Sequence, residues 1–370
     1  MKDTDILTNI ITDNKPNVIL NSFSYFRAVA IILIVAGHCF ELMAVNKNTQ
    51  LEKLLFSLID GGSALFVFIS GFLFYHVFYK KYNFIKFVKH KFIKIFIPYL
   101  VIGIPISLFY VLKQKTWYSG FFLPDGIGIF NTYIEPLFWY IVTGKMLGPY
   151  WYIPFIMLMF MLSALHIRFI ELSLKNQLVI TLIFTVMATI VHKPAFDQPS
   201  TFPLIIYYTP FYLIGIMCSM NKESIYLTLK GKEYFLVLAL IIFAYGESFV
   251  GSSGNFTRDF FLFNHLNLML FQNFMLVQKI ILSIFFLIFL HRFEHKNFRS
   301  LKVVANTSFA IYFLHIFIIL AINKLNLQSL FDDSWIRFLL LVLFNISICT
   351  FFALGLKKVF GAKSSYLIGY

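Results

Sequence analysis

Two ionisable residues, Arg27 and His38, interrupt an apolar stretch that runs from Phe23 to Met43. In a helix their separation returns, at about 100° per residue, to within about 20° of the same face, roughly 16 Å along the axis. A run of about 20 apolar residues is long enough to cross a bilayer. The spacing therefore predicts a transmembrane helix with a guanidinium near one end and an imidazole deep in the membrane, both on one face.

Each of these two residues also has a purely structural interpretation. An arginine in the first turn can extend to the lipid headgroups, so Arg27 alone is compatible with a topology anchor. His38 lies about four turns inside the run, where an ionisable side chain is costly and normally faces a bundle interior or a wet cavity. A neighbouring helix could satisfy it there. Their shared face favours a common function over two separate structural roles.

The composition is typical of a polytopic membrane protein. Apolar residues make up 59% of the 370 residues, whereas a soluble domain contains about 45–50%. The 48 Phe and 20 Tyr are spread along the chain, as suits a lipid-facing bundle with aromatic belts at its interfaces. The net charge of +14 comes from short lysine clusters between apolar runs. Membrane orientation accounts for such clusters, so no nucleic-acid partner is expected.

The three cysteines give no sign of a metal site or a disulfide framework. Cys39, Cys218 and Cys349 lie in or beside apolar runs at distant positions, without a CxxC pair or a Cys/His spacing that suits a metal. We interpret them as small core residues. The first 22 residues lack the basic start and long apolar core of a cleaved signal, so the first helix is expected in the mature protein.

About ten apolar runs predict an all-α fold, a polytopic transmembrane helical bundle. The basic stretch Lys80–Lys94 is expected to turn the chain back into the third span. The long connection 113–148, rich in Trp, Tyr, Gly and Pro, predicts a partly membrane-embedded cap. The predicted spans are 23–43, 61–79, 92–112, 149–167, 178–191, 203–220, 234–250, 271–291, 305–322 and 337–356.

Basic residues predict the orientation. With these spans, 20 of them fall on the side of the N-terminus and 10 on the opposite side. The positive-inside rule then predicts a multi-pass plasma-membrane protein with both termini in the cytoplasm, Arg27 near the cytoplasmic face and His38 in the outer half of the bilayer. The predicted organisation is a cytoplasmic N-terminal segment (1–22), a transmembrane domain (23–356) and a cytoplasmic C-terminal tail (357–370).

Further candidates for chemistry lie close to the first two spans. Lys91 and Lys94 are three residues apart and share a helix face, so with Arg27 they could hold a phosphorylated ligand. Alternatively they serve only the positive-inside rule or touch anionic lipid. The SGF sequence at 70–72 and the glycine pair at 61–62 could allow close helix approach or a backbone opening, although small residues are routine helix-packing devices in membranes.

Five segments occur in a characteristic order and spacing: Arg27 and His38 on the first span, GGSALFVFISGFLF at 61–74, KIFIPYL at 94–100, YWYIPFIM at 150–157 and SFAIYFLHIFII at 308–319. Together they resemble the acyltransferase-3 family of integral membrane acyltransferases over nearly the whole chain. The resemblance implies a helical bundle that takes an acyl group, usually acetyl, from cytoplasmic acyl-CoA and transfers it to a hydroxyl on the outer side. Typical acceptors are cell-surface sugars.

The resemblance assigns roles residue by residue. The family's essential arginine and histidine fall on Arg27 and His38, which become the expected catalytic pair. The family's Arg-x-x-Arg falls on Lys91 and Lys94, where lysine keeps the charge but loses the bidentate fork for phosphate. Arg27, Lys91 and Lys94 are therefore the expected contacts to acyl-CoA, with acetyl-CoA as the typical donor substrate and no metal.

Further residues are expected to contact the substrate. The family's WFL element falls on Trp151, Tyr152 and Ile153, without the glutamate that follows it in the branch that acetylates peptidoglycan and O-antigen. Tyr312 and His315 match its YxxH element, although His315 could equally be a core histidine. Ser70, Trp151 and Tyr152 are candidates for polar contacts, with packing as the alternative.

The branch of the family that the chain resembles allows two classes of function, acyl transfer and glycan export. We expect no appended hydrolase-like domain, and the length and GG-rich second span resemble the polysaccharide-intercellular-adhesin branch. Members of that branch have been considered either O-succinyltransferases or glycan exporters. The expected partners are membrane lipids, a surface-glycan acceptor and polysaccharide-synthesis proteins.

The residues allow two mechanisms and a rival function. Moving an acyl group from a thioester to an alcohol needs a base near the alcohol and a donor for the oxyanion. His38 could be the general base or could carry the acyl group as a covalent intermediate. In the rival interpretation, Arg27 and His38 line the conduit of a glycan or glycolipid exporter without acyl-transfer chemistry. A passive scaffold is a third interpretation, in which the shared face is accidental.

Overall fold

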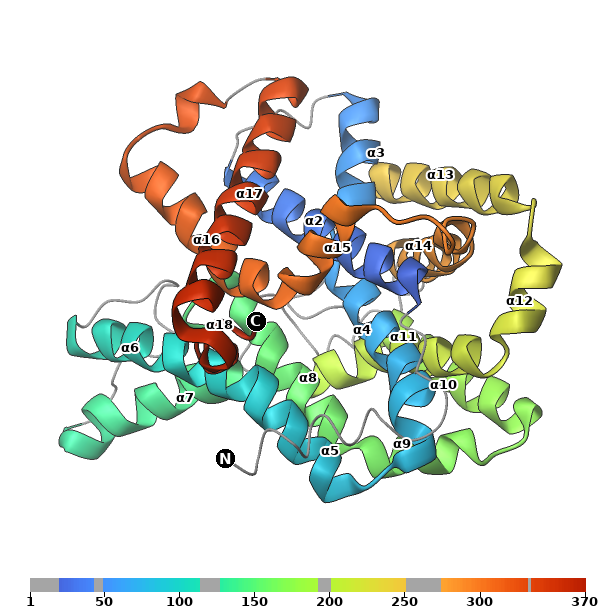
Figure 1. The fold of residues 1–370 in the computed structure, drawn as a ribbon, viewed down its shortest axis with the longest axis horizontal. Helices are drawn as coiled ribbons and strands as arrows, with labels where there is room; N and C mark the ends of the chain where they lie inside the picture. The colour runs from blue at the N-terminus through green and yellow to red at the C-terminus, as the bar shows by residue number, and fades with distance from the viewer. Residues whose placement is uncertain (1–19, 43–48, 114–126, 192–200, 251–273, 332–333) are drawn as a thin grey trace.

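A computed structural model of the chain describes residues 20–42, 49–113, 127–191, 201–250, 274–331 and 334–370. Within these ranges the chain forms helices and no strands, which confirms the predicted all-α class (Figure 1). In chain order the helices are α2 (Asn21–Leu42), α3 (Gln50–Ile59), α4 (Ser63–Leu73), η1 (Phe74–Phe78), η2 (Tyr79–Lys81), α5 (Phe84–Lys91), η3 (Phe92–Phe96), α6 (Ile97–Lys113), η4 (Phe130–Ile134), α7 (Glu135–Thr143), η5 (Gly148–Trp151), α8 (Tyr152–Met161), α9 (Ser163–Ile170), α10 (Leu174–Val191), α11 (Phe202–Met220), α12 (Lys222–Leu229), α13 (Glu233–Val250), α14 (Phe274–His291), α15 (Arg299–Asn306), α16 (Ser308–Lys324), η7 (Gln328–Leu330), α17 (Trp335–Phe360), η8 (Gly361–Lys363) and α18 (Ser364–Ile368).

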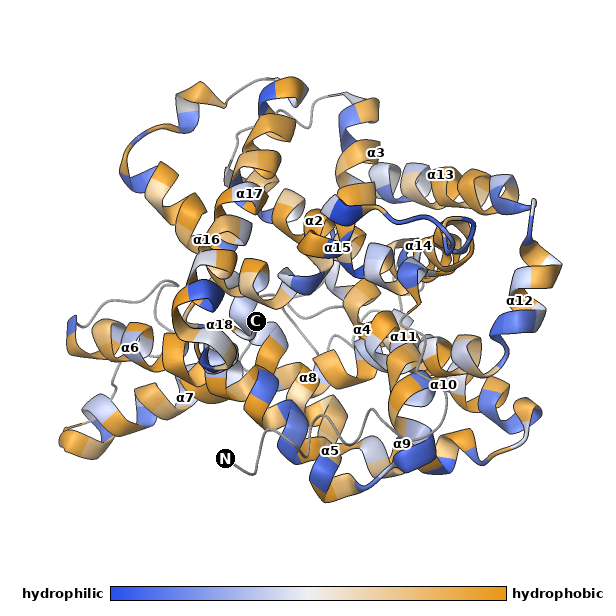
Figure 2. Cartoon of the chain, viewed as in Figure 1, coloured by the Kyte–Doolittle hydropathy of each residue, from blue (hydrophilic) through white to orange (hydrophobic). Residues whose placement is uncertain are grey.

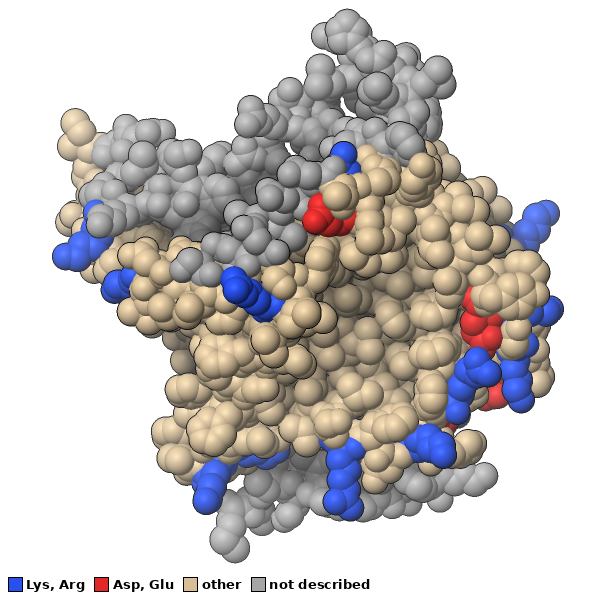
Figure 3. Space-filling view, turned by 90° about the horizontal axis from the view of Figure 1, so that it is seen from above, with Lys and Arg blue, Asp and Glu red and all other residues tan. Residues whose placement is uncertain are grey.

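Many of these helices have the length and apolar character of membrane spans. Seven continuous helical stretches in the described ranges, some of which join several of these helices, meet both criteria, or up to nine if each of two bent pairs counts as one span. Apolar residues cover most of the helix surfaces, and polar residues collect at the connecting segments (Figure 2). One face shows a broad uncharged surface with Lys and Arg at its borders, as expected where lipid tails meet protein (Figure 3). The chain is therefore a polytopic helical bundle.

Helix α2 occupies the centre of the bundle. It contacts α3, α4, α14, α15, α16 and α17, which belong to distant parts of the chain (Figure 1). Its N-terminal amides are capped by Glu294, whose two carboxylate oxygens accept hydrogen bonds from the backbone N–H groups of Asn21 (2.7 Å) and Ser22 (3.0 Å). A carboxylate at a helix N-terminus satisfies otherwise unpaired donors and favours the helix dipole. This cap fixes the end of α2 that carries Arg27.

The basic stretch Lys80–Lys94 differs from the predicted turn. Only its first residues turn the chain; helix α5 begins at Phe84 and continues through η3 into α6, one helical stretch from Phe84 to Lys113. The physical reason is Asn83, whose side chain accepts a hydrogen bond from the backbone N–H of Lys86 (3.0 Å) and caps the new helix. Lys91 and Lys94 therefore lie within a helix instead of preceding one.

Two bends break helices beside the polar residues of the bundle. Helices α8 and α9 meet at 53°, and α15 and α16 meet at 76°. The second bend makes Ser308 the first residue of α16.

Of the connection 113–148 that was predicted as a cap, residues 114–126 lie outside the described residues. The described remainder contains α7, which packs along α6 through a hydrogen bond from the Tyr99 hydroxyl to the carbonyl of Ile141 (2.6 Å).

Glycines allow α4 and α11 to touch through their backbones. A Cβ atom at Gly71 would overlap the carbonyl of Tyr212, and one at Gly215 would overlap the carbonyl of Phe68. Only a residue without a side chain permits this approach. The SGF sequence is thus explained by packing at Gly71, and this contact fixes the position of the adjacent Ser70.

Candidate functional site

Helices α2 and α16 meet at two levels, and each level holds one of the polar residues predicted on α2. At one level, Arg27 donates a hydrogen bond from Nη2 to Oγ of Ser308 (2.9 Å). At the other, the ring centroids of His38 and His315 lie 5.3 Å apart, with the ring planes tilted by 36°. Arg27 and His38 therefore both face α16, as their helical spacing predicted. We call this contact between α2 and α16 the seam. Arg27 lies at its cationic end, and His38 and His315 lie at its imidazole end.

The cationic end gathers positive charge without a visible counter-charge. Lys91 lies near enough to Arg27 for the two charges to repel each other. Its Nζ sits over the rings of Phe78 (4.7 Å) and Phe160 (4.8 Å), and such cation–π contacts stabilise a cation without neutralising it. In the described ranges, no acidic side chain pairs with Arg27, Lys91 or Lys94. A bound anion would relieve this repulsion.

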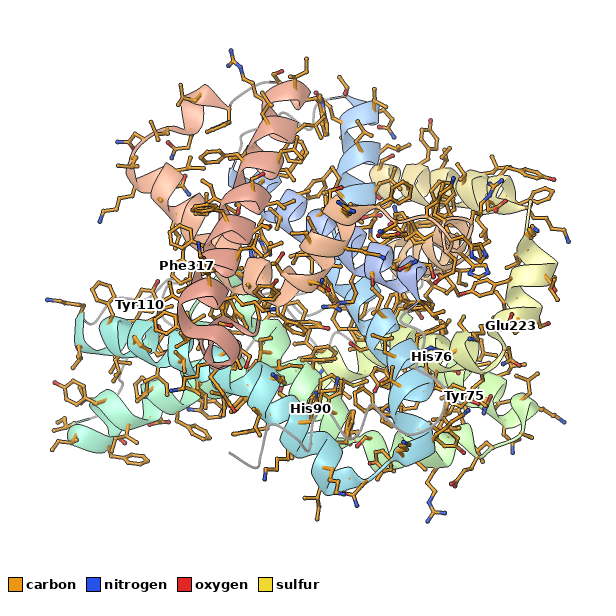
Figure 4. The ribbon with its side chains drawn as sticks, in the orientation of Figure 1. Tyr75, His76, His90, Tyr110, Glu223 and Phe317 are labelled. Carbon is orange, nitrogen blue, oxygen red and sulfur yellow. The ribbon has the colours of Figure 1, made fainter. Side chains whose placement is uncertain are left out.

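Lys94 lies at a different place from Lys91. It belongs to η3 and is half-buried, and its backbone carbonyl faces Gly369 at the end of the chain. His90, the residue before Lys91, is exposed on α5, and its label in Figure 4 shows where this part of α5 lies in the bundle. The structure therefore brings Lys91 to Arg27 and places Lys94 beside the C-terminal segment.

At the imidazole end, hydrogen bonding fixes the proton of His315. Its ring is fully buried, and Nδ1 lies 3.0 Å from the carbonyl oxygen of Ile311, one turn earlier in α16. A carbonyl oxygen can only accept a hydrogen bond, so Nδ1 carries the proton and Nε2 of the neutral ring keeps a lone pair. No hydrogen-bond partner for Nε2 exists among the described residues. His38 is half-buried beside this ring.

A buried asparagine that the sequence reasoning missed supports this end. Asn345 on α17 donates from Nδ2 to the carbonyl oxygen of His315 (3.1 Å) and accepts a hydrogen bond from Sγ of Cys349 (3.3 Å). It also contacts Sγ of Cys39, the residue after His38. Asn345 thereby ties α17 to both helices of the seam. In the sequence, Asn345 is recognisable as an amide in the middle of the tenth predicted span, 337–356.

The predicted substrate-contacting residues form one aromatic wall beside the seam. Tyr312 lies next to His315 (ring centroids 6.3 Å apart) and next to Tyr152 (5.9 Å), whose hydroxyl lies near Ser70. Trp151 stacks on Tyr208 at 5.9 Å. The structure therefore brings all five predicted residues into one neighbourhood.

The hydroxyls of Tyr312 and of the nearby Tyr150 form hydrogen bonds that hold two segments of the chain together. Tyr312 donates to the carbonyl of Pro149, and Tyr150 donates to the carbonyl of Phe313 (2.8 Å). These reciprocal bonds fasten α16 to the turn that starts α8. For Tyr312 the geometry therefore favours positioning of α16 over direct contact with a ligand.

A second buried polar cluster joins α3, α13 and α14. Ser57 donates to Glu247 (2.6 Å) and accepts from Nε2 of Gln278 (2.8 Å). Lys279 donates from Nζ to the carbonyl oxygens of Ser57 (2.7 Å) and Leu58 (3.1 Å), which belong to the last turn of α3. A cation at a helix C-terminus satisfies such carbonyls. Lys279 lies inside the predicted span 271–291, and none of the sequence predictions includes Glu247, Ser57 or Gln278.

We compared the chain with known proteins. A family model described as an acyltransferase domain matches residues 20–354. No curated protein and no solved structure matches the chain. Within the described residues, no group of three or more His, Cys, Asp or Glu side chains could hold a metal ion. The match begins just before α2 and includes both helices of the seam.

Proposed function

We propose, from the premise that this chain belongs to the acyltransferase-3 family, that it transfers an acyl group from cytoplasmic acyl-CoA to a hydroxyl of a cell-surface polysaccharide or glycolipid. Family membership and the apolar helices together make it a multi-pass membrane acyltransferase. Acetyl-CoA is the proposed donor, and the inner (plasma) membrane is the proposed location. The observation that carries the proposal is the seam between α2 and α16, with cations at one end and two imidazoles at the other.

The cationic end suits the phosphates of CoA. Arg27 and Lys91 repel each other and have no acidic partner within the described ranges, so a phosphate group between them would be bound by charge-assisted contacts. Arg27 supplies the planar, multiply donating group, and Lys91 and Lys94 supply point charges. We assign these three residues to donor binding. Lys94 lies beside Gly369, so we assign it the smallest contribution of the three.

The length of the seam suits the remainder of the donor. Arg27 and His38 are separated by roughly 16 Å along the helix axis, the distance from a phosphate-binding end to a reacting end. The pantetheine arm of CoA is an extended chain of this scale, so the thioester would arrive at His38. There His38 acts on the reacting centre, either as general base toward the acceptor hydroxyl or as carrier of the acyl group.

The acceptor is expected to reach the seam along the aromatic wall. Ser70, Trp151 and Tyr152 lie beside the seam, and aromatic rings with hydroxyl groups suit an acceptor that carries both C–H and O–H surfaces. Packing explains the Tyr312 hydroxyl, so we assign Tyr312 to positioning. Polysaccharide-synthesis proteins are the expected partners that deliver such an acceptor.

The test is acyl transfer by purified protein in lipid nanodiscs. Acetyl-CoA is the donor, N-acetylglucosamine oligomers are the probe acceptor, and release of CoA thiol and acetylation of the oligomer are measured together. The wild type should release CoA in step with oligomer acetylation, whereas His38→Gln should bind acetyl-CoA normally and transfer at least 100-fold more slowly, the usual loss when a general base is removed.

Two outcomes would contradict the proposal. A wild-type protein that inserts and binds no acyl-CoA, and releases no CoA, would favour the glycan-exporter alternative. Transfer by His38→Gln at the wild-type rate would show that His38 has no chemical role. Arg168→Gln is the matched control for a change of a polar residue, because Arg168 is exposed and its ion-pair partner among the described residues is Glu171, directly after α9.

A further inference from the structure

We infer that His315 is a second catalytic residue, whose Nε2 accepts the proton of the acceptor hydroxyl during acyl transfer. The inference rests on the proposed function and adds to it a division of labour between two histidines. His38 contacts the acyl group that arrives along the seam, and His315 acts on the nucleophile.

Hydrogen bonding gives His315 the protonation state that a base needs. Nδ1 lies 3.0 Å from the carbonyl oxygen of Ile311 and donates its proton to it, so the lone pair of the neutral ring is on Nε2. The backbone carbonyl also fixes the ring orientation, the role that an orienting acceptor plays for a general base in many hydrolases. The tautomer of His315 is therefore set before any substrate binds.

The surroundings leave this lone pair available. His315 is fully buried, and Nε2 has no hydrogen-bond partner in the part of the chain that the structure describes. A buried polar atom without a partner costs about 1–3 kcal/mol, so a purely structural histidine would normally have both nitrogens satisfied. An acceptor hydroxyl would supply the missing hydrogen bond.

The position of the ring places this lone pair at the reacting end. The centroid of His315 is 5.3 Å from that of His38, and Asn345 fixes the backbone of His315 from the other side. Tyr312, one turn earlier, is held by Pro149 and keeps α16 in place. The two imidazoles come from different helices, so one can act on the acyl group and the other on the acceptor hydroxyl.

The proton balance of the step is complete without another reactant. The hydroxyl oxygen forms a bond to the acyl carbon while its proton moves to Nε2 of His315. The carbon–sulfur bond breaks, the sulfur takes that proton, and the products are an ester and the CoA thiol. If His38 has first taken the acyl group, a carbon–nitrogen bond breaks instead, and the adjacent His38 ring takes the proton.

The ionisable groups that face His315 are few. His38 lies beside the ring, and Tyr312 lies one turn away with its hydroxyl donated to Pro149. The sulfur atoms of Cys39 and Cys349 contact the Asn345 side chain. None of these described groups occupies Nε2, so His315 is the group whose loss should change how the rate depends on pH.

The decisive variant is His315→Asn, because the asparagine amide can still donate to the carbonyl of Ile311 but offers no basic nitrogen. We expect normal insertion, an unchanged Kd for acetyl-CoA, and transfer to N-acetylglucosamine oligomers slowed at least 100-fold at neutral pH. The residual rate should rise about tenfold per pH unit, because hydroxide must then remove the proton. His166→Asn, a buried histidine outside the seam, controls for the loss of a buried ring.

The outcomes separate the inference from the proposed function. Transfer by His315→Asn at the wild-type rate overturns the inference and leaves the acyltransferase assignment intact. A slowed variant that keeps the wild-type pH profile also overturns it, because a structural defect lowers the rate equally at every pH. A wild-type protein that releases no CoA overturns the proposed function, and the inference with it. His315→Gln, which places its amide differently in the ring's space, repeats the test if His315→Asn fails to insert.

Discussion

Arg27 combines a specific hydrogen bond with an unfavourable charge environment. Ser308 at the first turn of α16 accepts from its guanidinium, and Lys91 repels it. A residue that served only as a lipid anchor would extend toward the headgroups. The inward hydrogen bond instead directs the guanidinium to the seam, where an incoming phosphate would meet it.

Replacing Arg27 with alanine should therefore weaken the binding of acetyl-CoA. A charge-assisted hydrogen bond contributes about 1.5–3 kcal/mol, which corresponds to a loss of roughly ten- to hundredfold in affinity. Lys91→Ala should weaken binding less, because a lysine offers no bidentate contact, and Lys94→Ala least, because Lys94 lies beside Gly369. Calorimetry or fluorescence on protein in nanodiscs measures the three Kd values. An unchanged Kd for Arg27→Ala in folded protein would return Arg27 to the role of an anchor.

At the scale of the helices, the contact between α4 and α11 depends on glycine. Gly71→Ala should destabilise the bundle by about 1–3 kcal/mol, because the added Cβ meets the backbone of Tyr212 and forces the helices apart. Gly355→Ala is the matched control: this glycine lies in α17 with no atom within 4 Å of its would-be Cβ, and alanine should stabilise the helix by up to about 1 kcal/mol. Thermal unfolding in detergent compares the two. Equal shifts would contradict the close packing of α4 on α11.

The cluster around Ser57 gives a second expectation at this scale. Lys279→Met should destabilise the bundle by about 3–5 kcal/mol, because it leaves Glu247 without its nearby cation and the last carbonyls of α3 without a donor. Adding Glu247→Gln should recover part of the loss, since the uncompensated buried charge is then removed. Unfolding temperatures of the single and double variants test this coupling. An additive or absent effect would show that the two side chains do not interact.

For the whole molecule, the basic residues predict which ends of the helices face the cytoplasm. We expect a cysteine at position 53 to react with a membrane-impermeant thiol reagent in intact cells, and a cysteine at position 86 to react only in opened membranes. Lys53 and Lys86 are both exposed, and the three native cysteines are buried, so background labelling should be low. Labelling of both positions from outside would refute the orientation and the assignment of Arg27 to the donor side.

Local features of the sequence determined the class of the fold and the first half of the site. Apolar runs specify membrane helices because the helix rise is a local property of the backbone and the bilayer thickness sets the length that one run must reach. For the same reason the shared face of Arg27 and His38 could be predicted. The basic stretch at 80–94 is helical from Phe84 onward because Asn83 caps α5, which the charge pattern of the stretch does not indicate.

Only the tertiary structure decided which residues complete the site. Ser308 and His315 lie more than 270 positions from Arg27 and His38 in the sequence, so their contacts follow from how α16 packs on α2. The separation of Lys91 from Lys94 and the proximity of Glu247 to Lys279 likewise depend on partners from other helices. Periodicity identifies the face of a helix, whereas the three-dimensional packing of the bundle determines what that face meets.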